Sequence, residues 1–258
     1  MFIKYRNWQL ARKFGIVEEN PMTVFLDQSY FLNIIAVFPE FKSLSPKTNE
    51  RNIWVGAITN DNYTPHRPVL DNHLITMALE EWIAKPSTQR LVYVSLGSVL
   101  HNKIGLFNVI LKGLENKYRV VVAAGDSLMR LRKRYSQNEN VFLVRYAPQA
   151  AVLKKAHVFV THCGMNSVNE AIKYSVPMVG IPLGNDQPRV ATVVCEEYNM
   201  GIRLDCETLR SSDVERAVAE ILENNEYKRN VERWSEILRE RNGAKNCSDL
   251  ISSFLYSI

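Results

Sequence analysis

The sequence predicts an α/β fold built on a doubly wound, Rossmann-like parallel sheet. Between residues 90 and 160, short apolar runs alternate strictly with segments of helical periodicity. The runs are apolar on both faces, which is typical of parallel strands covered by helices on either side. Glycine and small polar residues follow the runs, at the strand ends where such sheets bind ligands.

The opening of the chain is less regular than the rest. Residues 5–14 predict a short amphipathic helix, and residues 23–26, 34–37 and 52–56 predict brief strands. Residues 59–68 are polar, aperiodic and contain prolines, so they predict a linker.

The regular alternation begins after this linker. Residues 74–85 predict a helix that ends before Pro86, because a proline disfavours helical geometry in the residue before it. The alternation continues with strands at 90–98, 119–124, 141–144 and 158–160, helices at 104–114 and 126–135, and a short helix ending at Leu153. Beyond residue 210, apolar stripes predict two helices, a break at Asn242-Gly243 and a final amphipathic helix.

Composition excludes several classes of protein. The chain of 258 residues is 46% hydrophobic and 23% charged, which indicates a globular protein of one domain or one and a half. The net charge is +5, but the basic residues are scattered, and the one dense run, residues 130–134, reads as a solvated helix face. We therefore expect no nucleic-acid partner.

Two further features concern location and redox chemistry. No apolar run reaches the length of a membrane span, and the first residues lack the apolar core of a signal peptide, so we expect a soluble, cytoplasmic protein. The cysteines, Cys163, Cys195, Cys206 and Cys247, have no paired spacing. They predict buried or half-buried thiols rather than a zinc site or a disulfide framework.

One stretch predicts a phosphate site. Residues 158–160 form a buried strand, Gly164 allows close approach of the backbone, and Asn166 and Ser167 stand where helix caps belong. The N–H groups of a helix start attract an anion. The alternative is a capping box, in which Ser167 caps the helix and Glu170 folds back onto the same turn.

Longer motifs favour the ligand. Tyr146-Ala-Pro-Gln149 precedes this stretch, Thr161-His-Cys-Gly164 opens it, and Gly180-Ile-Pro-Leu-Gly-Asn-Asp-Gln187 follows it. Their order and spacing resemble the donor-binding signature of the UDP-glycosyltransferases, most of all the branch that glycosylates macrolides and other small lipophilic acceptors. The resemblance covers residues 85–258 well and the first 60 residues weakly. It implies the C-terminal half of a GT-B glycosyltransferase.

The resemblance also implies a set of donor-binding residues: Gly97, Ser98, Tyr146, Ala147, Gln149, His162, Gly164, Asn166, Ser167, Glu170, Asp186 and Gln187. Tyr146 stands where the family usually has the tryptophan that stacks on uracil, with Ala147 and Gln149 beside the base. Glu170, expected on the first helical turn, would hold the ribose. The glycines, His162, Asn166 and both serines would surround the diphosphate, and Asp186 and Gln187 would bind the sugar, although an Asn-Asp turn explains their composition equally well.

The implied activity is transfer of a hexose, with inversion, from a UDP-sugar to a hydroxyl of a small lipophilic acceptor. The UDP-sugar is a substrate, and we expect no cofactor and no metal, since no Asp-x-Asp motif of metal-dependent glycosyltransferases stands in a suitable place. The family's general base is a histidine of the N-terminal domain, and no residue here matches it. His66, His73 and His101 lack any motif, so we assign no catalytic residue.

The resemblance implies four segments. They are a remnant of the N-terminal acceptor domain at 1–60, an interdomain linker and helix at 61–88, the donor-binding domain at 89–240, and a helix at 241–258 that packs back toward the N-terminal domain.

Two other hypotheses stay open. The chain could be an incomplete nucleotide-sugar-binding subunit, or a truncated product, that needs a separate or missing acceptor domain. A generic dinucleotide-binding Rossmann protein is disfavoured, since Gly-x-Gly-x-x-Gly does not follow the first strand.

Overall fold

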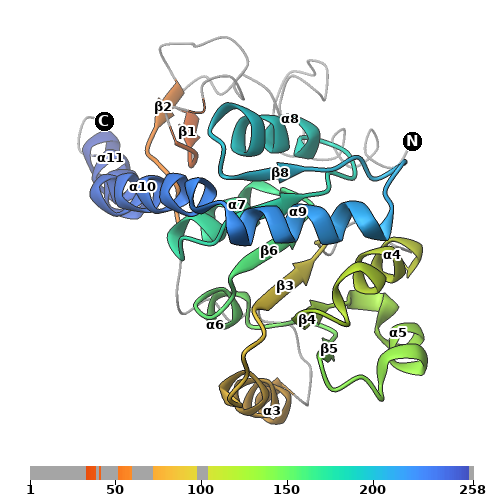
Figure 1. Ribbon diagram of the computed structural model, residues 1–258. Helices are drawn as coiled ribbons and strands as arrows, with labels where there is room; N and C mark the ends of the chain where they lie inside the picture. Colours follow the sequence, from red (N-terminus) through yellow and green to blue (C-terminus); the bar gives the residue numbers. More distant parts are fainter. Residues whose placement is uncertain (1–32, 39–40, 42–51, 60–71, 98–103, 256–258) are drawn as a thin grey trace, which may run out of the picture.

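The computed structural model describes residues 33–38, 41, 52–59, 72–97 and 104–255 (Figure 1). Its centre is a parallel six-stranded sheet in the order β5-β4-β3-β6-β7-β8. The strands are β3 (Leu91–Ser95), β4 (Arg119–Ala123), β5 (Val141–Val144), β6 (Val158–Thr161), β7 (Met178–Gly180) and β8 (Gly201–Arg203). The chain order reverses between β3 and β6, which is the switch point of a doubly wound sheet. The predicted fold class is confirmed.

Helices follow the strands. They are α3 (Asn72–Ala84), α4 (Ile104–Leu114), α5 (Leu128–Tyr135), α6 (Gln149–Leu153), α7 (Met165–Lys173), α8 (Gln187–Ala191), α9 (Ser211–Glu223), α10 (Asn225–Arg241) and α11 (Gly243–Leu255). A 3-10 turn, Gly125–Ser127, precedes α5, and a π-helical turn, Thr192–Glu197, extends α8. Among the helices that the structure describes, none has the length and apolarity needed to cross a bilayer.

Each face of the sheet has its own core, because successive strand residues point to opposite sides. Val92 and Val94 of β3 pack with α4, α5 and α9 on one face. Tyr93 lies on the other face, with α6, α7, α8 and α10. The apolar strands that the sequence shows are therefore buried on both sides.

Most of the predicted elements are confirmed. The helix at 104–114 and the strand at 141–144 have their predicted bounds. The break at Asn242 is a left-handed helix end with φ 42°, between α10 and α11. The predictions at 5–14 and 23–26, and nearly all of the predicted linker at 59–68, lie outside the described residues.

A second, two-stranded parallel sheet pairs β1 (Asn33–Ile35) with β2 (Asn52–Trp54) and lies beside α10 and α11 (Figure 1). The rings of Phe38 and Phe41 contact Trp234 of α10, with centroids 5.3 and 5.0 Å from the indole. Asn246 of α11 donates to the carbonyl oxygen of Val55 at 3.1 Å. The α10–α11 helices thus pack on the early segment, while the division into four segments remains a prediction.

Candidate functional site

The carboxyl ends of the central strands surround a cavity of about 340 Å³ at the switch point. Its walls come from the exits of β3 and β6, the start of α7, and the loop after β7. They consist of Leu96, Gly97, His162, Gly164, Met165, Asn166, Ser167, Asn185, Asp186 and Gln187. Seven of these ten residues belong to the predicted donor site, so the fold brings together motif residues that are up to 90 positions apart in sequence.

The turn from β6 into α7 is strained. Cys163 has a left-handed backbone with φ 60°, which side-chain-bearing residues rarely adopt. Its N–H donates to Oγ1 of Thr161 at 3.2 Å. The buried Cys163 thiol hydrogen-bonds Cys195, and this bond and burial raise the pKa of the thiol, so it stays protonated. Cys163 therefore shapes the turn and is no nucleophile.

The helix begins earlier than predicted. Gly164 is the N-cap and no side chain caps the first turn, so the prediction that Asn166 and Ser167 cap the helix is wrong. The capping box does not form either, and Glu170 lies on the second turn. The reason is Gly164 itself, whose extended backbone (φ −64°, ψ 138°) already has N-cap geometry.

This early start leaves donors at the cavity. The first helical bond of α7 runs from Val168 N to Gly164 O at 3.0 Å. The N–H groups of residues 165–167 come before this bond and have no acceptor within the helix, and these residues line the cavity. A helix start of this kind, with its positive dipole end, attracts an anion.

His162 is held between two glycines. A Cβ atom built on Gly97 or on Gly164 would lie 2.6 Å from Nε2 of His162, closer than real Cβ contacts. Only glycine therefore fits at either position without moving the ring. The two glycines of the motif create the space that places an imidazole on the cavity wall.

Gln149 and Glu170 do not line the cavity but connect to it through Ser167. Gln149 Nε2 donates to Ser167 Oγ at 3.3 Å and to Glu170 Oε2 at 2.5 Å. Burial raises the pKa of Glu170, and the bond from Gln149 and the nearby Lys173 oppose this effect. The carboxylate thus lies in a partly dry environment, where hydroxyl donors bind it strongly.

The loop after β7 presents Asp186 and Gln187 in different ways. Gln187 is buried, and its Oε1 accepts from Leu183 N at 2.8 Å, which leaves its amide N–H groups as donors. Asp186 is exposed and, although it is the N-cap of α8, its side chain makes no capping bond. An ordinary capping role is thereby excluded for this carboxylate.

Two further predicted residues, Tyr146 and Ala147, are not among the residues that line the cavity. Tyr146 and Ala147 are half-buried in the turn after β5, and Ser98 lies outside the described residues. Sequence reasoning missed Leu96, Met165 and Asn185, which line the cavity. Asn185 has φ 56°, and the Gly-Asn pair was the signal for this left-handed turn.

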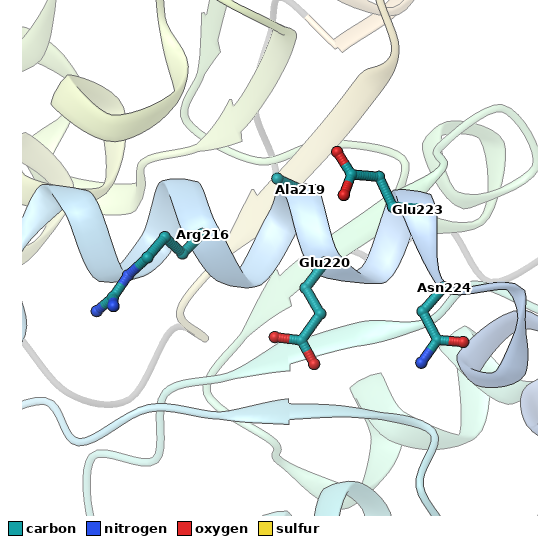
Figure 2. A pocket seen from close by; sticks show the side chains of 5 residues that line it. All are labelled: Arg216, Ala219, Glu220, Glu223 and Asn224. Carbon is teal, nitrogen blue, oxygen red and sulfur yellow. The ribbon is translucent and has the colours of Figure 1, made fainter.

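Within the described part of the chain, no group of three or more His, Cys, Asp or Glu residues could hold a metal ion. A hollow of about 480 Å³ lies against α9 and is lined by Arg216, Ala219, Glu220, Glu223 and Asn224. Figure 2 shows that its side chains come from a single helix and the residue after it.

Two of the polar residues of this α9 hollow, Glu220 and Asn224, already have structural roles. Asn224 accepts from Glu226 N at 3.0 Å as the N-cap of α10, and Glu220 accepts from Tyr227 OH at 2.8 Å. At the switch point, functional groups converge from several elements, whereas in the α9 hollow they come from one helix and the residue after it.

Fold and cavity together define a doubly wound α/β domain with a cavity at the switch point, and the uncapped start of α7 lies on the wall of this cavity. The particular family follows from comparison. The model of the family "UDP-glucoronosyl and UDP-glucosyl transferase" matches residues 69–244, and the chain belongs to this family.

Individual relatives agree with this assignment. The chain is 28% identical to the uncharacterized UDP-glucosyltransferase YdhE of Bacillus subtilis, over 90% of this chain and 55% of that protein. It is 33% identical to UDP-glucuronosyltransferase 2B18 of Macaca fascicularis, over 63% of this chain and 30% of that protein. The chain spans about half the length, or less, of the curated relatives it matches.

Solved structures show the same fold. Os79 of O. sativa in complex with UDP has 28% identity and a TM-score of 0.59, over 68% of this chain and 43% of that one. The glycotransferase of kitacinnamycin has 24% identity and a TM-score of 0.69, over 86% and 55%. CalG4, the calicheamicin glycosyltransferase, has 21% identity and a TM-score of 0.69, over 98% and 60%. The chain shares its fold, which is of the GT-B type, with the kitacinnamycin glycotransferase and with CalG4.

Proposed function

We propose that the chain supplies the donor site of a UDP-dependent glycosyltransferase and binds a UDP-sugar at the switch point. One observation carries the proposal: the uncapped start of α7, His162 and two glycines face one cavity of a chain in the UDP-glycosyltransferase family. Os79, which is similar to this chain, binds UDP, and this supports the nucleotide assignment.

The nucleotide would extend from the turn after β5 to the loop after β7. In this proposal, Tyr146 stacks on the uracil, the backbone groups of Ala147 meet its edge with Gln149 beside them, and Glu170 accepts from the ribose hydroxyls. Base-to-aromatic stacking of this kind contributes on the order of 1–3 kcal/mol. The half-buried position of Tyr146 at a strand exit is compatible with this role.

The diphosphate would lie at the cavity wall that carries the donors. Gly97 would approach it from the exit of β3, and His162, Gly164, Asn166 and Ser167 from the β6–α7 turn. Ser98, which lies outside the described residues, stays a predicted donor to the diphosphate. Asp186 and the amide N–H groups of Gln187 would bind the sugar. The bond from Leu183 to Gln187 supports this orientation, because it fixes which end of the amide faces the ligand.

We propose transfer of a hexose, with inversion, to a hydroxyl of a small lipophilic acceptor. When UDP leaves, negative charge develops on the β-phosphate, and the helix N–H groups and side-chain donors stabilise it. This scheme requires no metal, in agreement with the set of donors at the wall. Another structure of Os79 contains trichothecene, a ligand that supports an acceptor of this class here.

We propose that the general base comes from residues other than those that line this cavity, and that His162 acts there as a donor to the diphosphate. The cavity wall offers donors and sugar ligands, whereas proton removal from an acceptor typically needs a positioned base worth roughly 10²–10⁴-fold. We propose that an acceptor-binding domain supplies this base. The alternative is a nucleotide-sugar-binding subunit without transfer activity of its own.

Titration calorimetry with UDP in the presence of a chelator tests the proposal. We expect saturable binding of UDP and of UDP-sugar, with little binding of ADP or NAD as controls. Absence of UDP binding by folded protein would overturn the proposed function, and binding only with added magnesium would overturn the metal-free scheme.

Turnover separates enzyme from binding subunit. The 258-residue chain, given UDP-sugar and a small phenol, should transfer sugar very slowly, and an added or fused acceptor domain should restore the rate. Ordinary enzymatic rates with the chain alone would place the base within it.

A further inference from the structure

Tyr93 carries a hydroxyl into the core between β3 and the helices of one face. The residue is 1% exposed, and its ring stacks on Phe159 of β6, with centroids 4.8 Å apart and planes at 12°. A phenylalanine would pack in the same place, whereas a buried hydroxyl must find a hydrogen-bond partner or lose free energy. The hydrogen-bond partners of the Tyr93 hydroxyl therefore indicate what it contributes to the structure.

The Tyr93 hydroxyl begins a chain of hydrogen bonds that ends at the cavity. It donates to Gln149 Oε1 at 3.1 Å, and Gln149 Nε2 donates to Glu170 and Ser167. A carboxylate can only accept, so the amide must turn its N–H groups toward Glu170 and its oxygen toward Tyr93. Burial raises the pKa of Tyr93 well above its usual range, although a hydrogen bond with Ser95 opposes this effect, so the hydroxyl keeps its proton and can donate it to Gln149.

This orientation decides what the cavity presents to a ligand. Because Ser167 accepts from Gln149, its own proton points elsewhere, and Ser167 lines the cavity. Glu170 Oε2 is occupied by Gln149, and the carboxylate is thereby fixed with its other oxygen directed away from that bond. The result is a hydroxyl donor beside the anion site and a fixed acceptor next to it.

We propose that Tyr93 is a positioning residue of the donor site, which acts through Gln149 to fix Ser167 as a donor to the diphosphate and Glu170 as an acceptor for the ribose. This inference rests on the proposed function, because it assigns those two ligand groups. Tyr93 contacts no ligand itself. Chains of bonds with one direction polarise one another, so loss of the first bond weakens the later ones.

The test is Tyr93→Phe, which removes one buried oxygen and keeps the stacked ring. Tyr135→Phe is the matched control: Tyr135 is 2% exposed, lies on the other face of the sheet, and its hydroxyl has no hydrogen-bond partner among the described residues. Calorimetry measures affinity for UDP and 2′-deoxyUDP, and urea unfolding measures stability. A double-mutant cycle with Gln149→Met tests whether Tyr93 acts through Gln149.

We expect Tyr93→Phe to weaken UDP binding roughly three- to tenfold, the worth of about one hydrogen bond. The loss should be smaller for 2′-deoxyUDP, which lacks a ribose hydroxyl for Glu170. This ratio does not depend on the fraction of protein that folds. In the Gln149→Met background, Tyr93→Phe should cost no further affinity, and Tyr135→Phe should leave binding unchanged.

Three results would overturn the inference while the proposed function stands. They are wild-type affinity in Tyr93→Phe, equal losses for both nucleotides, and full additivity with Gln149→Met. Folded wild-type protein that binds no UDP would overturn the proposed function and the inference with it.

Discussion

At the amino ends of the strands, buried polar side chains bond to the main chain of the fold, whereas at the carboxyl ends polar side chains face a cavity. Arg119, the first residue of β4, shows the first case. Its guanidinium donates to the carbonyl oxygens of Trp82, Ile83 (3.3 Å) and Lys85 (3.1 Å) and lies 4.1 Å from the centroid of the Trp82 ring. It thereby satisfies the last carbonyls of α3.

His157, just before β6, follows the same rule. Its ring Nδ1 accepts from the backbone N–H of Leu91 at 3.1 Å, and the backbone N–H of His157 donates to Leu91 O at 2.8 Å. One histidine thus joins the starts of the two central strands. The ring nitrogen Nδ1 of His157 thus bonds to the main chain of the sheet and not to a ligand.

The carboxyl ends differ in backbone and in polarity. Left-handed residues follow four of the strands. Gly125 follows β4, whereas Gly97 after β3, Cys163 after β6 and Asn185 after β7 line the cavity or stand next to residues that line it. At Cys163 and Asn185, which carry side chains, this conformation is strained, and such strain is tolerated where function needs it. Substitutions at the carboxyl ends should therefore change binding, and substitutions at the amino ends should change stability.

The largest expected effect is that of Gly164→Ala at the carboxyl ends. The new methyl would lie 2.6 Å from Nε2 of His162, so the ring must move off the cavity wall. Loss of a charge-assisted hydrogen bond, about 1.5–3 kcal/mol, predicts roughly tenfold to hundredfold weaker UDP binding by calorimetry.

Gly105→Ala is the matched control, since an added methyl there meets no atom within 4 Å. It should leave UDP affinity unchanged. The comparison of the two ends would fail if Gly164→Ala lost stability in urea but kept its affinity.

At the amino ends, Arg119→Leu should reverse this pattern. It leaves carbonyl groups of α3 without their donor, which predicts a loss of about 1–3 kcal/mol in the free energy of unfolding. UDP affinity should stay the same. Arg216→Leu, at an arginine whose side chain is 78% exposed, should change neither quantity. Weaker UDP binding by Arg119→Leu would couple the two ends of the sheet.

A smaller effect is expected from Asp186→Asn. Because the Asp186 side chain makes no capping bond, its loss should not change stability. If the carboxylate accepts from a sugar hydroxyl, UDP-sugar should lose about 0.5–1.5 kcal/mol of affinity relative to UDP. Competition calorimetry gives this ratio, and an unchanged ratio would remove Asp186 from the site.

Periodicity predicted the fold well because both cores are built from continuous apolar runs. The strand at 141–144 and the helix at 104–114 have no competing pattern, so their bounds are as expected. β7, β8 and the π-helical turn at Thr192–Glu197 were not predicted. β7 and β8 have only three residues each, and a π turn differs from an α-helix by one inserted residue, which leaves no clear periodic signal.

The cavity residues were predicted from motifs, and the errors come from backbone geometry. The serine–glutamate spacing predicted a cap at Ser167, but Gly164 already has N-cap geometry, so α7 begins at Met165. Tyr93 was missed because a tyrosine in an apolar strand reads as core. Only the fold shows that its hydroxyl reaches Gln149, 56 residues away in sequence.

The smallest expected effect concerns pH and His157. Burial and the nearby Arg90 lower the pKa of His157, so the unfolded chain binds a proton more readily than the folded one. Its contribution to stability should be constant above the unfolded pKa of about 6.5 and be lost as pH falls through that value. The ring is only half-buried, which keeps the effect small.

His157→Asn provides the comparison, because its amide oxygen can accept from Leu91 N but cannot be protonated in this range. Urea midpoints of the two proteins should agree in their pH dependence above pH 7. Toward pH 5.5, the wild-type midpoint should fall below that of His157→Asn. UDP affinity at pH 7.5 should be equal in both, because this histidine serves the amino ends alone. Parallel midpoints at every pH would show that protonation of His157 does not break the bond between the central strands.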